Sequence, residues 1–243
     1  MRQKHKIKQS GNILLFILIA ILLIGLLTIS LTRSNNSTNE TGSYEQQQIV
    51  ISSFLRYAKT LQNGILQLMA AGCGENEISF ENSVVTGYEN TNAPSDNSCH
   101  LFASEGAGLS WQTPDVKITN LPYAIYGDHS VHGVGTTDKP IVAGNADLII
   151  VMPNIPASLC DAVNRQTENG ITITPTDRGD SISDGTERKF IGTFTADDDI
   201  SGDPGNDICP EDGDTALCGV TTGCFQEAAG GEYNVFYSVL YPR

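Results

Sequence analysis

The stretch ILLFILIAILLIGLLTISLT, residues 13–32, contains 20 residues and no charge. As an α-helix it would be about 30 Å long, which matches the hydrocarbon thickness of a bilayer. A secretory signal peptide has a shorter apolar core of roughly 7–15 residues and small residues at its cleavage site. This run instead ends in SLTR at residues 30–33. The sequence therefore predicts a single transmembrane helix over residues 12–33.

Charge differs sharply between the two sides of this run. Residues 1–11 contain four basic side chains and no acid, whereas Arg33 is the only charge just after the run. This bias predicts a cytoplasmic N-terminus and export of the rest of the chain. The exported part holds ten basic and 28 acidic residues, a net charge of about -18. Nucleic acid is therefore not an expected partner, because a phosphate backbone must be met by clustered Lys and Arg.

All six cysteines follow the apolar run, and none belongs to a C-x-x-C pair. An even number without metal-ligand spacing predicts three disulfides in an oxidising compartment, the periplasm or the cell surface. Six buried free thiols are the alternative. Six cysteines allow about 15 pairings, so the sequence does not choose among them. Placement relative to the expected elements favours Cys73 with Cys99, Cys209 with Cys218, and Cys160 with Cys224.

The residues around the start of the apolar run, KQSG at 8–11 followed by NILLF at 12–16, resemble a type IV prepilin leader. In that family a short basic leader ends in Gly and is removed by prepilin peptidase, which usually methylates the new N-terminus. The resemblance implies cleavage between Gly11 and Asn12, with the peptidase, the inner membrane and other pilin-like subunits as partners. The first mature residue is usually Phe or Met, here Asn12, and the fifth is usually Glu, here Phe16. An apolar fifth residue implies a minor or tip-like subunit.

Four islands farther along the chain are similar to uncharacterised prepilin-like proteins of alphaproteobacteria. They lie at residues 78–82, 98–102, 160–164, and 223–225 with 233–240. This similarity implies the same class and export. The alternative for the N-terminus is an ordinary uncleaved signal anchor.

Residues 34–43 are polar and rich in Asn, Ser and Thr, which predicts a short linker or a frayed continuation of the helix. An exported head follows over residues 44–243. Residues 44–71 predict an amphipathic helix, because apolar residues recur at helical spacing. This stripe consists of Ile51, Phe54, Ala58, Leu61, Ile65 and Leu68. Gly72 suits the exit from this helix.

Residues 72–243 are expected to be β-rich. Strand patterns occur at residues 146–152, 171–174, 189–195 and 233–241. A short helix is predicted over residues 154–166, with Asn154 as its cap and Pro156 in its first turn. The predicted fold class is therefore α+β, a long N-terminal helix packed on an antiparallel sheet in a disulfide-stapled head.

Two segments carry clustered polar side chains of the kind used in chemistry, and the first runs from Asp128 to His132. It offers two His and a carboxylate, but its flanking glycines favour a solvated loop over adventitious metal binding. The chain contains neither a G-x-S-x-G nor an H-E-x-x-H motif. The sequence therefore predicts a protein that is not an enzyme.

The second segment, residues 197–214, contains eight carboxylates interrupted by glycines. Its start resembles the opening of a calcium loop, and calcium binds six to eight oxygens on flexible loops. The candidate calcium ligands are Asp197, Asp199, Ser201, Asp203 and Asp207. Ile208 occupies the position where an EF-hand needs Glu, so this is not an EF-hand. A solvated acidic loop that keeps the head soluble is the alternative.

These patterns together predict a structural or assembly subunit of a type IV pilus-like or type II secretion pseudopilus filament. The alternative is a monomeric membrane-tethered periplasmic protein whose head binds a ligand or serves in adhesion.

Overall fold

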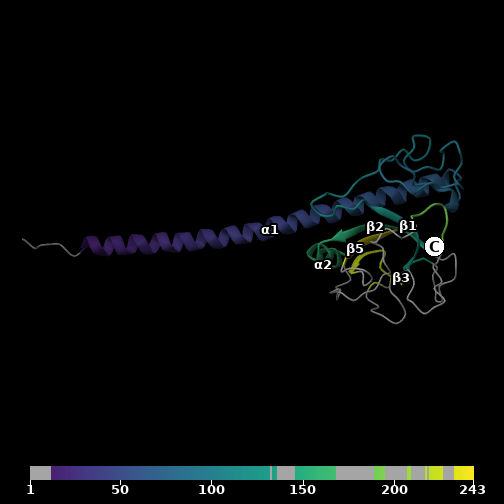
Figure 1. Ribbon diagram of the computed structural model, residues 1–243. Helices are drawn as coiled ribbons and strands as arrows, with labels where there is room; N and C mark the ends of the chain where they lie inside the picture. Colours follow the sequence, from purple (N-terminus) through teal and green to yellow (C-terminus); the bar gives the residue numbers. More distant parts are fainter. Residues whose placement is uncertain are drawn as a thin grey trace, which may run out of the picture. The chain divides into compact units, whose positions relative to one another are not determined.

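The computed structural model describes residues 12–131, 133–135, 146–167, 189–194, 207–208, 217, 219–226 and 233–243. The helices are α1 (Asn12–Ala70), α2 (Ala157–Gln166) and the short 3-10 helix η1 (Glu75–Glu77). The strands are β1 (Ala124–Val131), β2 (Asp147–Ile155), β3 (Asp207–Ile208), β4 (Thr222–Gln226) and β5 (Asn234–Tyr241), as Figure 1 shows. This composition confirms the predicted α+β class. The chain forms two compact units, Met1–Ile49 and Val50–Arg243.

The five strands form one sheet in the order β3-β1-β2-β5-β4. The pairs β1–β2, β2–β5 and β5–β4 are antiparallel, so the predicted antiparallel sheet is present with four strands. The two-residue β3 adds to β1 in parallel. The neighbouring strands β2 and β5 are buried almost throughout. This burial explains why the sequence of β2 is a nearly continuous run of apolar residues.

The last part of α1 packs its predicted stripe against one face of this sheet (Figure 1). Every member of the stripe is at most 2% exposed, and all belong to one core cluster with residues of β1, β2 and β5. The Phe54 ring lies 4.1 Å from Phe236 on β5 and 5.7 Å from Tyr123, centroid to centroid. Burying each large apolar side chain contributes roughly 1.5–3 kcal/mol, so this contact is the main tie between helix and sheet.

The earlier part of α1 is helical, and its described apolar side chains are largely exposed. Residues 34–43 belong to its backbone, which agrees with a helical continuation and not with a linker. The large apolar side chains between Leu15 and Ile24 are 44–66% exposed. Over the residues that the structure describes, no helix is both long and apolar enough to cross a membrane.

α1 ends where the sequence predicts, in a Schellman motif at Gly72. The Cys73 amide donates to the Leu68 carbonyl at 3.1 Å, and the Gly72 amide donates to Met69 at 3.0 Å. Gly72 has a φ of 108°, a conformation that costs a residue with a Cβ atom. Residues 71–123 then form a long connection that contains η1 and no strand longer than an isolated bridge.

Two local predictions need correction, and a third is not tested. The short helix begins at Ala157 and not at Asn154, because Ile155 still pairs with Asn234 and keeps residues 154–155 in β2. Lys189 forms an isolated bridge with Tyr126, so the described part of the predicted strand 189–195 pairs at one point only. The predicted strand 171–174 lies outside the described residues.

Candidate functional site

The predicted processing site falls at the edge of the described chain. Asn12 is the first residue of α1, and Gly11 lies outside the described residues. The large apolar side chains that follow, between Leu15 and Ile24, are exposed and belong to the compact unit Met1–Ile49.

The predicted calcium ligands fall almost entirely outside the described residues. Asp197, Asp199, Ser201 and Asp203 lie there, and Asp207 contributes its backbone to β3. Within the described ranges, no group of three or more His, Cys, Asp or Glu side chains is placed to hold a metal ion.

The segment interpreted as a solvated loop is instead part of β1. Asp128 is 6% and His129 0% exposed, and His129 Nδ1 lies 2.8 Å from Asp128 Oδ1. The register of β1 with β2 shifts between Tyr126 and His129, next to this pair. The polar side chains in the sequence gave no sign of this buried strand. His132 lies outside the described residues.

Asp147, at the start of β2, is a fully buried carboxylate that sequence reasoning missed. Its Oδ2 accepts a hydrogen bond from the Val131 amide and its Oδ1 from the Arg243 amide, each at 2.9 Å. Burial raises the pKa of Asp147 to about 6, although these two amides act in the opposite direction. Asp147 therefore ties the ends of β1 and of the chain's last strand to β2.

Two of the three predicted disulfides are confirmed. Cys73 and Cys99 are bridged with a Cα–Cα distance of 5.8 Å, and Cys160 and Cys224 with 5.3 Å. The first joins the exit of α1 to the long connection, and the second joins α2 to β4. Both Cys209 and Cys218 lie outside the described residues.

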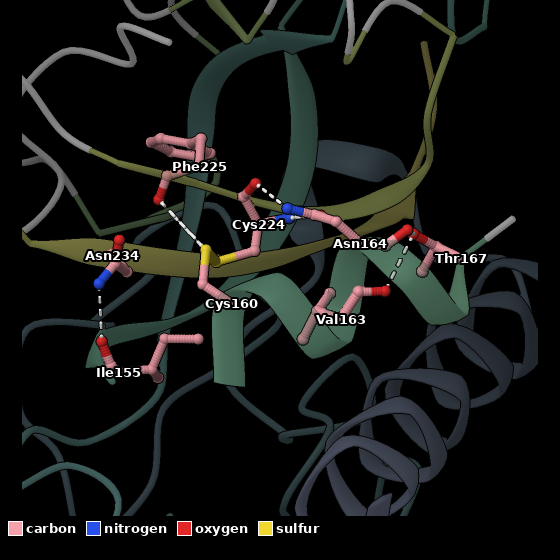
Figure 2. The surroundings of a disulfide bond; sticks show 8 residues. All are labelled: Ile155, Cys160, Val163, Asn164, Thr167, Cys224, Phe225 and Asn234. Carbon is pink, nitrogen blue, oxygen red and sulfur yellow. Dashed lines mark hydrogen bonds between the residues drawn. A yellow bond between two sulfur atoms is a disulfide. The ribbon is translucent and has the colours of Figure 1, made fainter. Parts of the chain in front are cut away.

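Asn164 reinforces the second disulfide, as Figure 2 shows. Its Nδ2 donates to the Cys224 carbonyl at 2.9 Å, and its Oδ1 accepts from the Cys224 amide at 2.8 Å. The side-chain amide thus satisfies both backbone groups of Cys224 that face away from β5. In this way α2 covers the outer edge of β4, which would otherwise offer unpaired groups to another strand.

The head also contains a hollow of about 640 Å³ on the connection between α1 and β1. We call it the connection hollow. Its lining comes from three short segments: Glu81, Asn82, Ser83 and Val84; Asn97, His100, Phe102 and Ala103; and Leu109, Ser110 and Trp111. Its volume falls within the range of small-molecule sites, roughly 300–1,000 Å³.

The aromatic wall of the connection hollow is held in place from behind. The Trp111 ring lies 5.4 Å from Phe102 and 5.7 Å from Tyr88. Tyr88 is 1% exposed, and its hydroxyl accepts from the Ile125 amide of β1 at 3.0 Å. Burial raises the pKa of Tyr88 above its ordinary range, so the hydroxyl stays neutral. The sheet therefore positions the wall through Tyr88.

Hydrogen bonds also order the polar rim of the connection hollow. Asn97 has a φ of 61°, and its carbonyl accepts from the His100 amide at 3.1 Å. The neighbouring Cys99 is fixed to the end of α1 by its disulfide. Sequence reasoning missed this site because its residues are spread over 31 positions without a motif. The one available signal was Trp111, the only tryptophan of the chain.

Comparison with models of known families, with curated proteins and with solved structures found no match for this chain.

Proposed function

We propose that the protein is a non-catalytic structural or assembly subunit of a type IV pilus-like or type II secretion pseudopilus filament, in a minor or tip position. In this proposal residues 1–11 are a cytoplasmic leader that prepilin peptidase removes. Residues 12–33 anchor the chain in the inner membrane as a single pass, and the head lies in the periplasm or on a surface filament.

The observation that carries the proposal is the extent of α1. Its described residues, Asn12–Ala70, form one helix that includes both the apolar run and the stripe that packs on the sheet. A helix satisfies its backbone hydrogen bonds internally, so such a segment can enter a lipid bilayer or an apolar filament core. The exposed side chains between Leu15 and Ile24 are the ones that need this cover.

Two observations support export: the disulfides of the head and the distribution of charge around the apolar run. Its bonds between Cys73 and Cys99 and between Cys160 and Cys224 favour an oxidising compartment. Four basic residues and no acidic residue precede the apolar run, and all 28 acidic residues follow it, as expected for a cytoplasmic N-terminus.

A second candidate function is a monomeric membrane-tethered binding protein with an uncleaved anchor. The connection hollow supports it, because a preformed site with an aromatic wall can bind a ligand without assembly into a filament.

Replacing Gly11 tests the proposal. We expect Gly11→Val to block removal of the leader in cells that contain a prepilin peptidase, because the family's site accepts little beyond a small residue before the cut. Gly25→Val is the matched control: it introduces the same side chain where no other atom lies within 4 Å of a new Cβ. The control should be processed like wild type. If wild type itself keeps residues 1–11, the filament proposal is wrong.

A further inference from the structure

The connection hollow contains polar groups that the fold does not use. Glu81, Asn97 and His100 line the hollow, and in the described part of the chain none of their side chains takes part in a hydrogen bond or ion pair. Glu81 and Asn97 are exposed and His100 is partly exposed, so all three can reach a ligand. The Trp111 Nε1 atom is buried and also has no acceptor there. This donor therefore belongs to the buried side of the wall, and the groups that can meet a ligand are the accessible side chains of Glu81, Asn97 and His100.

The charge of the lining excludes one class of ligand. Glu81 is the only Asp, Glu, Lys or Arg among the lining residues, so no Lys or Arg is present to meet an anion. The exported part has a net charge of about -18, which repels anions over a longer range. Anionic ligands are therefore disfavoured.

The hydrogen-bonding types separate a cation from a neutral polar molecule. A cation would suit Glu81 and the aromatic faces but would use none of the donors of Asn97 and His100. Asn97 supplies both a donor and an acceptor, and His100 supplies one of each when neutral. A ligand with many hydroxyls satisfies donors and acceptors together, and a sugar ring also has an apolar C–H face that can lie against an aromatic wall.

We propose that the connection hollow is a binding site for a neutral oligosaccharide. One sugar ring packs against Trp111 and Phe102, and its hydroxyls bond to Glu81, Asn97 and His100. The disulfide at Cys99 and the Tyr88 contact hold the two sides of the hollow before the ligand arrives, which reduces the entropy lost on binding.

Tryptophan fluorescence is a direct test, because Trp111 is the only tryptophan in the chain. The full chain is kept in a detergent without a sugar headgroup and titrated with neutral tetrasaccharides of glucose and of N-acetylglucosamine, up to about 10 mM to include weak binding. We expect a saturable change with at least one of them and none with an oligogalacturonate. A failure of all neutral sugars, or an equal response to tetralysine, would overturn the proposal.

Two variants and one control locate the signal. Glu81→Gln keeps the size of the side chain, and Asn97→Gly suits the positive φ at this position. Each should weaken binding by about three- to tenfold, as expected for the loss of one hydrogen bond. Glu89→Gln changes an exposed carboxylate outside the hollow and should leave binding unchanged.

Equal binding by wild type and by both hollow variants would place the sugar elsewhere and refute the assignment. Because the titration is performed on detergent-dispersed protein, its outcome does not depend on leader removal or filament assembly. A protein that keeps its leader can still bind the sugar, so the two proposals fail separately.

Discussion

The two segments of α1 contain similar side chains in opposite surroundings. The large apolar residues between Leu15 and Ile24 are 44–66% exposed, whereas Leu61 and Ile65 are completely buried. Both segments are helical, so the difference does not come from the backbone. The stripe of the second segment packs on the sheet, whereas the first segment belongs to the other compact unit and its large apolar side chains are largely exposed. The helical pattern therefore predicts the backbone equally well in both segments. Packing of the apolar side chains on the sheet of the head is seen for the second segment.

The largest expected effect comes from removing a buried side chain. Leu61→Ala should lower the free energy of unfolding of the head by about 2–5 kcal/mol, because it deletes packed atoms and leaves a cavity. Leu22→Ala is the matched control in the exposed segment and should change head stability by less than about 0.5 kcal/mol. Chemical denaturation of both variants in detergent measures this. Equal losses would show that the two segments are not energetically distinct.

Loss of a disulfide should also act on the head alone. Replacing Cys160 and Cys224 together by Ala should lower head stability by roughly 4 kcal/mol, since 64 positions separate them. The corresponding double variant of Cys73 and Cys99, which are 26 positions apart, should lose slightly less, roughly 3.5 kcal/mol. Thermal melts give the order, while membrane retention should be unchanged in both. A larger loss for the shorter loop would contradict the chain-entropy explanation.

Asp147 should make head stability depend on pH. Its pKa is raised to about 6 in the fold, so the folded state binds this proton more tightly than the unfolded chain does. Its stabilising contribution is fully present below about pH 4 and is lost as the pH rises through 6, a change of about 1–3 kcal/mol. Asp147→Asn should remove this component of the pH profile. An unchanged difference between wild type and variant from pH 4 to 7 would refute it.

The smallest expected effects on stability come from replacing two glycines and have opposite signs. Gly72→Ala should destabilise the head by about 1 kcal/mol, because Gly72 has a φ of 108°. Gly25→Ala lies in the helix interior with open space around a new Cβ and should favour the helix by about 0.5–1 kcal/mol. Denaturation midpoints report the first, and helicity by circular dichroism reports the second. The same sign at both positions would show that the two backbones do not differ as described.

Periodic and local features were predictable from the sequence. The α1 stripe, strands β2 and β5 and the Gly72 exit follow from spacing and turn chemistry. The two confirmed disulfide pairs were favoured by the place of their cysteines relative to the expected elements, not by spacing alone. β1 was not predicted, because Asp128 and His129 suggest solvent exposure, yet both are buried and His129 Nδ1 lies 2.8 Å from Asp128 Oδ1 inside the strand. Such a contact between two buried polar side chains cannot be predicted from the hydrophobic pattern of the sequence.

The remaining errors also come from contacts between distant residues. Asn154 has the chemistry of a helix cap, yet Asn234 Nδ2 donates to the Ile155 carbonyl at 3.1 Å and helps to hold this stretch against β5. The connection hollow exists only because segments 81–84, 97–103 and 109–111 meet in space. Neither result has a local pattern from which it could be predicted.

Mass spectrometry of the mature N-terminus of the full chain, purified from membranes, tests the central claim most directly. The account predicts a chain that starts at Asn12 and carries a methyl group on its new amine. Residues 1–11 still attached in a producing cell with an active prepilin peptidase would contradict the filament proposal and favour the tethered binding protein.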